Sequence, residues 1–200
     1  MIVSSFLSQT NPLIFFMKSR FGRGEEWMAE QKLFSMMHAD RQVTDPMFIK
    51  KMLDLTETCT IALYDEPYPY IVPMNFGYDW EENLEIYLHC AAEGHRMSLI
   101  RENSWVACNI NVFINRYGKE PYRNEKQDYR SVSVFGRLEI IEEEEERKNA
   151  LNAICRQTGA PLLRRVPKNG NPVVLRLRAD QITAKAQYPL SGISEIEMPL

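Results

Sequence analysis

Three short segments with the alternating apolar pattern of β-strands follow one another between Cys59 and Cys90, and they constrain the fold more than any other feature. They read CTIALY, YIVPMNFGY and LEIYLHC, and the turn sequences DEP and DWEEN lie between them. A parallel pair of strands needs a crossover connection of a dozen or more residues. Since these connections are shorter, the three segments are expected to form an antiparallel meander.

Further strand and helix signals lie on both sides of this meander. Asp45 can cap a helix whose first position is Pro46, and a helix from Glu142 to Thr158 can end at Gly159 in a left-handed cap. A short helix is expected over RMSLIREN, and strands over WVACNINV, YRSVSVFGRLEII and PVVLRLRADQITAKA. Several strands at short spacing, with a few helices outside the run, predict an α+β fold built on a small antiparallel barrel.

Charge and cysteine usage narrow the class of protein. The net charge of −3 at pH 7 argues against a nucleic-acid partner held by phosphate neutralisation. The 4 cysteines form no CxxC pair, which favours a reduced cytoplasmic protein over a disulfide framework or a zinc site. The apolar N-terminal segment is interrupted by SQTNP, so neither a signal peptide nor a membrane span is expected there.

Two charged stretches have competing interpretations. The acidic run from Glu142 to Glu146 could bind a metal ion, but acids at a helix N-terminus with basic residues further along match the helix dipole better. The basic loop LLRRVPKNGNP could contact a phosphate or be a solvated connection. With 3 histidines, no HExxH motif and no cysteine at zinc-like spacing from them, no metal site is expected.

His89 lies in the third strand segment, on the face opposite to its apolar residues. Strand periodicity puts Leu84, Ile86, Leu88 and Cys90 on one face, and His89 on the other. This weakens a core role for His89 and leaves two alternatives, an ordinary surface histidine or one that faces a ligand. It also argues against a Cys90–His89 nucleophilic pair, because adjacent strand residues point to opposite faces.

The segment that follows, AAEGHR, has features of a phosphate site. Gly94 allows a tight turn, and His95 and Arg96 begin a short helix whose free backbone N–H groups attract anions. Any loop–helix junction with one glycine and one arginine shares these features, so the motif alone is weak.

Pro73 lies inside an otherwise clear strand, where it removes a ladder donor. It indicates an edge strand or a bulge, or a strand whose backbone turns toward a ligand. Asn75 shares its face and could donate to a heterocycle.

Taken together, PYIVPMNFGY, LHCAAEGHR and YRSVSVFGRLEII resemble, in order and spacing, the pyridoxamine 5′-phosphate oxidase-like flavin-binding split β-barrels. The nitroimidazole-resistance proteins are the most similar subgroup, and DRQVTDP and VVLRLRADQITAKA also fit. The resemblance covers residues 39–186, which implies a split-barrel domain over 39–186, a non-core leader over 1–38 and a tail over 187–200.

The resemblance implies a homodimer with flavin mononucleotide (FMN), or occasionally flavin adenine dinucleotide (FAD), at the interface. His89 would face the active site. The phosphate would be held by Gly94, His95 and Arg96, and Tyr129, Arg130 and Ser131 would complete the pocket from the same or the partner subunit. The residues expected along the isoalloxazine ring are Val72, Pro73, Met74 and Asn75.

The chain departs from the family pattern in three ways. The family often has lysine or arginine in place of His95, and the loop from Phe113 to Gln127 is longer than usual. The substrate-binding arginine motifs of the vitamin-synthesis oxidases are not found, so that activity is not expected.

Three functions remain open on the sequence. The first is an FMN-dependent oxidoreductase that reduces a small electron-accepting substrate, with His89 as proton donor. The second is a haem-binding or haem-handling protein with His89 as axial ligand. The third is a flavin-binding module without turnover.

Overall fold

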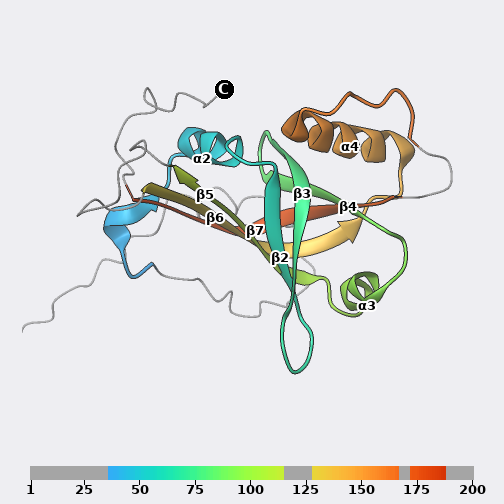
Figure 1. The fold of residues 1–200 in the computed structure, drawn as a ribbon, viewed down its shortest axis with the longest axis horizontal. Helices are drawn as coiled ribbons and strands as arrows, with labels where there is room; N and C mark the ends of the chain where they lie inside the picture. The colour runs from blue at the N-terminus through green and yellow to red at the C-terminus, as the bar shows by residue number, and fades with distance from the viewer. Residues whose placement is uncertain (1–35, 115–127, 167–171, 188–200) are drawn as a thin grey trace, which may run out of the picture. The chain divides into compact units, whose positions relative to one another are not determined.

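A closed antiparallel barrel dominates the computed structural model, which describes residues 36–114, 128–166 and 172–187. Within these residues one sheet runs in the order β1-β7-β4-β3-β2-β5-β6, and an additional pairing of β6 with β7 closes it (Figure 1). β1 is an extra strand on β7. The strands are β1 (Gln42–Val43), β2 (Thr58–Leu63), β3 (Tyr70–Trp80), β4 (Leu84–Cys90), β5 (Trp105–Ile114), β6 (Asp128–Ile140) and β7 (Val173–Ala186). The predicted α+β split barrel is confirmed.

The helices begin and end where the capping residues predict. The Asp45 carboxylate accepts the Met47 N–H at the start of α2, and Gly159 ends α4 with a φ of 68°. Glu143 caps α4, which confirms the helix interpretation of the acidic run. The helical segments are η1 (Ala39–Arg41), α2 (Pro46–Leu53), α3 (His95–Glu102) and α4 (Glu144–Thr158).

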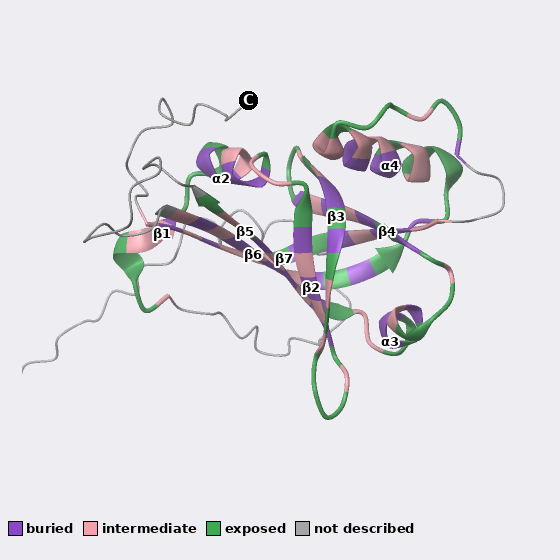
Figure 2. Ribbon diagram, in the orientation of Figure 1, coloured by how far each residue is buried: buried purple, intermediate pink, exposed green. Residues whose placement is uncertain are grey.

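Side chains alternate between the barrel interior and its outer surface along β2, β3 and β4 (Figure 2). The inward residues, such as Ile61, Phe76 and Leu88, are fully buried. α4 covers the outer surface of β3 and β4 so closely that a Cβ on Gly77 would lie 2.3 Å from the Ala153 carbonyl carbon. A glycine is therefore required at that point of contact.

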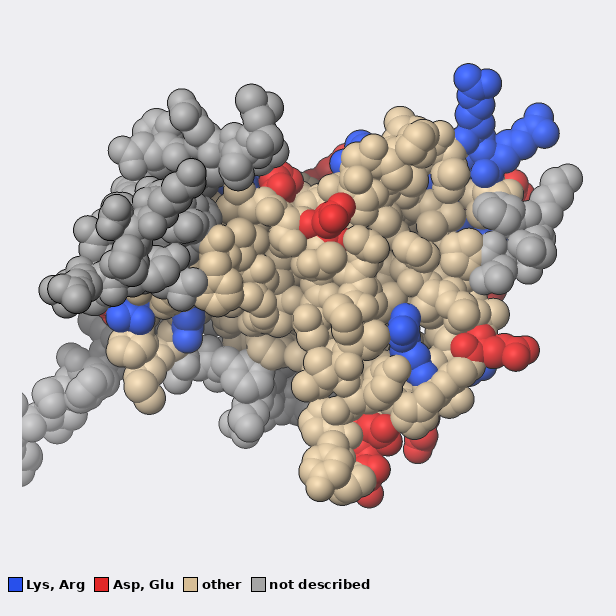
Figure 3. All heavy atoms as spheres, viewed as in Figure 1, with Lys and Arg blue, Asp and Glu red and all other residues tan. Residues whose placement is uncertain are grey.

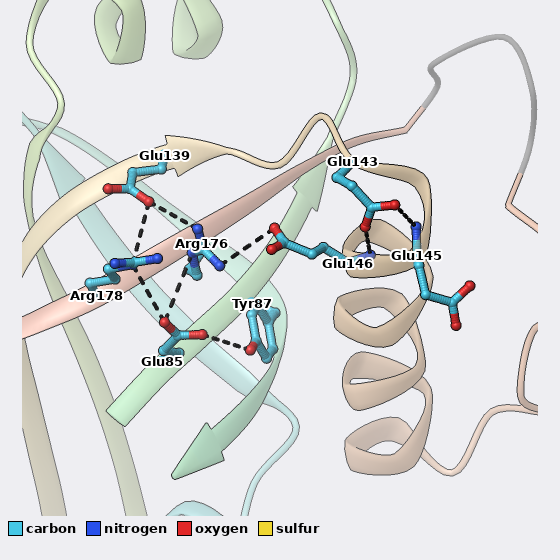
Figure 4. A network of polar contacts seen from close by, with 8 residues as sticks. All are labelled: Glu85, Tyr87, Glu139, Glu143, Glu145, Glu146, Arg176 and Arg178. Atoms are coloured by element: carbon cyan, nitrogen blue, oxygen red, sulfur yellow. Dashed lines mark hydrogen bonds and ion pairs between the residues drawn. The ribbon is translucent and has the colours of Figure 1, made fainter. Parts of the chain in front are cut away.

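A network of charged side chains fixes α4 beside the barrel (Figure 4). Arg176 of β7 lies 3.2 Å from Glu139 of β6 and 3.7 Å from Glu146 of α4. Arg178, two residues further along β7, lies 3.4 Å from Glu85 and 3.5 Å from Glu139. Glu139 thus lies near both guanidinium groups, and the Arg176 guanidinium links α4 to the sheet through Glu146.

The two halves of β3 have different neighbours, and the candidate site lies along the half that is not paired with β4. Residues Phe76–Trp80 pair with β4, whereas Tyr70–Asn75 pair with β2. We call Tyr70–Asn75 the open edge of β3, since no ladder with β4 continues along it. Pro73 lies in this segment, which is the edge position expected for a proline inside a strand.

Several predictions fall on residues that the structure does not describe. The leader over 1–38, the tail over 187–200 and the long loop after β5 lie wholly or almost wholly outside the described residues. In the part of the chain that is described, no helix is long and apolar enough to cross a membrane.

Candidate functional site

The open edge of β3, the end of β4 and the start of α3 come together at one end of the barrel (Figure 1). The Arg96 Nη1 atom lies 3.8 Å from the Met74 Sδ atom, so the first turn of α3 contacts the open edge directly. The His95 ring lies edge-on to the Tyr70 ring, with the ring centroids 5.2 Å apart. The fold therefore brings the YIVPMNFGY and AAEGHR motifs into contact.

His89 is exposed on the outer surface of β4, as the alternation along that strand predicted. The ladder between β3 and β4 stops at the Phe76–Leu88 pair, so His89 extends just past it. Pro73 and Asn75 are also exposed, on the outward-facing side of β3. The core interpretation of His89 is excluded, and His89 stands beside the point where the ladder opens.

Arg96 is placed to bind an anion. Gly94 precedes α3 with a φ of 108°, and no side chain caps the helix. The Arg96 Nε atom is buried and has no hydrogen-bond partner, and among the described residues no carboxylate pairs with this guanidinium. An unpaired buried donor of this kind is costly. An anionic group at the start of α3 would satisfy both the helix N–H groups and Arg96.

Two sulfur-containing side chains lie close to Arg96. Besides Met74, these include Cys90, whose thiol donates to the Met97 Sδ atom at 3.4 Å. Burial raises the pKa of the Cys90 thiol, while the nearby Arg96 guanidinium acts in the opposite direction. A neutral thiol leaves the Arg96 charge without a counterion.

His95 has a partner that the sequence did not predict. Its Nε2 atom lies 2.7 Å from the Asp65 Oδ2 atom, in the loop between β2 and β3. The hydrogen bond with His95 holds the pKa of the Asp65 carboxyl below its ordinary value, and the Glu66 N–H adds to this effect. Asp65 is separated from His95 by 30 residues, so no local pattern connects them.

Tyr129, Arg130 and Ser131 lie elsewhere in the chain. The Arg130 side chain is 1% exposed, and its guanidinium carbon lies 5.2 Å from the centre of the Phe48 ring in α2. Ser131 accepts a hydrogen bond from Asn109 at 3.4 Å on the outside of the barrel. Figure 1 shows α2 and the start of β6 at the opposite end of the barrel from α3. Within the single chain these residues do not join the open edge.

A surface with few charged side chains extends sideways from the open edge over β2, β5 and β6, with Arg137 of β6 stacked on Trp105 at its margin. Figure 3 shows that the middle of the surface over β2 and β3 carries no charged side chains. Ile71 is 64% exposed and Trp105 is 52% exposed. We call this surface the neutral face; its outward residues include Thr58, Thr60, Ala62, Ile71, Pro73, Trp105, Ala107, Asn109, Asn111, Ser131 and Ser133.

No metal site accompanies these residues. In the described ranges, no three His, Cys, Asp or Glu side chains are grouped so that they could hold a metal ion. The polar groups of the site are instead those of Arg96, two histidines, Asn75 and backbone amides, with the Asp65 carboxylate paired to His95.

Comparisons with known proteins agree with the barrel and its motifs. A family model described as pyridoxamine 5′-phosphate oxidase matches residues 48–186. A candidate 5-nitroimidazole antibiotic resistance protein of Bacteroides thetaiotaomicron is 25% identical, with a TM-score of 0.60, over 72% of this chain and 86% of that protein. A search of curated proteins found no match.

Two further solved structures share the fold at lower identity. The flavocytochrome Anf3 of Azotobacter vinelandii is 19% identical, with a TM-score of 0.61, over 78% of this chain and 74% of that one. An FAD and haem binding protein of Mycobacterium smegmatis is 21% identical, with a TM-score of 0.56, over 73% of each chain.

Proposed function

Since this chain belongs to the pyridoxamine 5′-phosphate oxidase family, we propose that it is an oxidoreductase that binds a flavin nucleotide beside the open edge of β3. The observation that carries the proposal is the buried, unpaired Nε atom of Arg96 at the uncapped start of α3. The structural neighbours support the same cofactor class, because an FAD and haem binding protein and a flavocytochrome share the fold.

The residues around the open edge suit the parts of such a ligand. Arg96 and the first N–H groups of α3 would hold a phosphate by charge-assisted hydrogen bonds. The backbone of Val72, Pro73, Met74 and Asn75 would lie along the flat ring. Asn75 already donates to the Glu57 carbonyl oxygen at 3.3 Å, which limits the rotation of its side chain.

His89 would contact the substrate and would not bind the phosphate. The flavin would supply the electron transfer. The exposed His89 imidazole would donate a hydrogen bond or a proton to a small electron-accepting substrate such as a nitroaromatic compound. His89 lies one residue beyond the last β3–β4 pair, and its side chain is exposed there.

The neutral face would be the contact between two copies of the chain. Exposed Ile71 and Trp105, the latter with the Arg137 guanidinium 4.1 Å from its ring centre, have the composition of a protein interface, in which aromatic residues and arginine are enriched. Such a homodimer would place Tyr129 and Ser131, which lie far from α3 in their own protomer, near the partner's open edge.

The visible spectrum of the purified protein tests the proposal. Flavin bands are expected, and a Soret band in their place would support the haem alternative with His89 as axial ligand. The flavin reduced with dithionite without oxygen should be reoxidised by an added nitroaromatic compound. Flavin bands without any such reoxidation would leave only a binding module.

A further inference from the structure

Asp65 holds the first side chain of α3. His95 is the first residue of the helix, and its Nε2 atom lies 2.7 Å from the Asp65 carboxylate. The carboxylate is itself fixed, because its Oδ1 atom accepts the Glu66 N–H at 2.9 Å. Tyr64 adds a further link within the loop by donating its hydroxyl to Glu66 at 2.8 Å. The β2–β3 loop thus presents one fixed negative charge at the start of α3.

This charge lies where a bound phosphate would be held. A phosphate at the start of α3 would find the His95 Nε2 atom already occupied, and Arg96 as the one guanidinium in the first turn. It would also be repelled by Asp65 across the width of one imidazole ring. The Asp65 side chain is 28% exposed, so solvent screens this repulsion only in part.

We propose that Asp65 sets the charge of the phosphate group that this site accepts, and that it favours a dinucleotide pyrophosphate over a terminal phosphate. This inference rests on the proposed flavin site. A terminal phosphate monoester carries about −1.5 to −2 charges at pH 7. Each phosphate of a pyrophosphate diester carries a single charge, so the repulsion at one position is smaller. Asp65 therefore lowers the affinity for FAD less than it lowers the affinity for FMN.

Asp65→Asn tests this inference because it removes the charge and keeps the shape and an acceptor oxygen. The dissociation constants of FMN, FAD and riboflavin are measured by titration of the apoprotein. FMN affinity should rise about tenfold, equivalent to about 1.4 kcal/mol, and FAD affinity only about three- to fivefold, in proportion to its smaller charge. Riboflavin, which has no phosphate, should bind as before. Glu66→Gln is the matched control, since it removes a neighbouring charge of the same loop that does not contact His95.

The outcomes separate this inference from the proposed function. Equal gains for FMN and FAD, a gain for riboflavin, or the same gain in Glu66→Gln would overturn the role of Asp65. If Arg96→Ala weakens flavin binding while Asp65→Asn does not change the FMN-to-FAD ratio, the flavin site stands and the role of Asp65 falls. If no flavin binds to any variant, the proposed function itself fails.

Discussion

At the scale of single residues, Arg96 offers the most direct test of the phosphate site. A charge-assisted hydrogen bond contributes about 1.5–3 kcal/mol, so Arg96→Ala should weaken flavin binding by roughly one to two orders of magnitude. The measurement is the flavin dissociation constant. Arg156→Ala, in the last turn of α4, is the control and should bind flavin normally. An unchanged constant in Arg96→Ala would place the phosphate elsewhere.

His89 should affect turnover and leave cofactor binding intact. Loss of a general acid typically lowers a rate by about 10²–10⁴. His89→Ala should therefore keep its flavin and lose nitroaromatic reduction by such a factor, measured as kcat at saturating substrate. His38→Ala removes another exposed histidine, which precedes η1 and belongs to neither the open edge nor α3, and should be fully active. Full activity in His89→Ala would identify His89 as an ordinary surface residue.

The Asp65–His95 contact predicts a pH dependence of stability. The pKa of Asp65 is lowered on folding, so its contribution to stability is fully present above the unfolded carboxyl pKa of about 3.9. It is lost as the pH falls through the lower, folded pKa. Thermal unfolding should show the native chain to be more stable than Asp65→Asn near neutral pH and equally stable in strong acid. A difference that persists in strong acid would contradict this.

Single residues also show what sequence reasoning could reach. Alternation along β4 predicted the outward face of His89, and the same rule applied to β6 would have found the burial of Arg130. Val132 and Val134 point to the inner face of β6, and Arg130, two residues before Val132, shares that face. The Asp65–His95 contact has no such signal, because only the tertiary fold brings a loop to a helix 30 residues away.

At the scale of elements, the charged network between α4 and the barrel should depend on Arg176 far more than on Arg178. The Arg176 side chain is 17% exposed and is shared by Glu85, Glu139 and Glu146, whereas Arg178 is 55% exposed. Arg176→Gln leaves these carboxylates close together without their central cation, and should lower the free energy of unfolding by about 1–3 kcal/mol.

Denaturant unfolding provides the measurement, and Arg178→Gln provides the matched control. Because Arg178 is more exposed, its substitution should lower the free energy of unfolding by less than about 1 kcal/mol. Equal losses in the two variants would show that partial burial of Arg176 gives it no special role.

The elements themselves were predictable wherever a local rule determines their ends. α2 begins at Pro46 after the Asp45 cap, and α4 ends at Gly159, both as the sequence indicated. β1 was missed because its two residues, Gln42 and Val43, are too few to show any period. The pairing of β6 with β7, which closes the barrel, is set by long-range contacts that no single segment encodes.

At the scale of the whole molecule, the neutral face predicts self-association. A charge at Ile71, which is 64% exposed in the protomer, would be buried in the proposed interface. Ile71→Asp should therefore shift the dimer to monomer in sedimentation and weaken flavin binding at the same time. Met47→Asp changes a side chain that is 60% exposed on α2, outside the neutral face, and should remain dimeric. A native chain that sediments only as a monomer would contradict the proposed interface.

The open edge of β3 also bears on how the chain behaves at high concentration. Unpaired strand edges invite strands of other molecules to add to them, which is a common route to aggregation. Pro73 lies in the middle of this edge and has no N–H to offer to an incoming strand. Pro73, which we propose to lie along the flat ring of the ligand, would thus also hinder strand addition when that ligand is scarce.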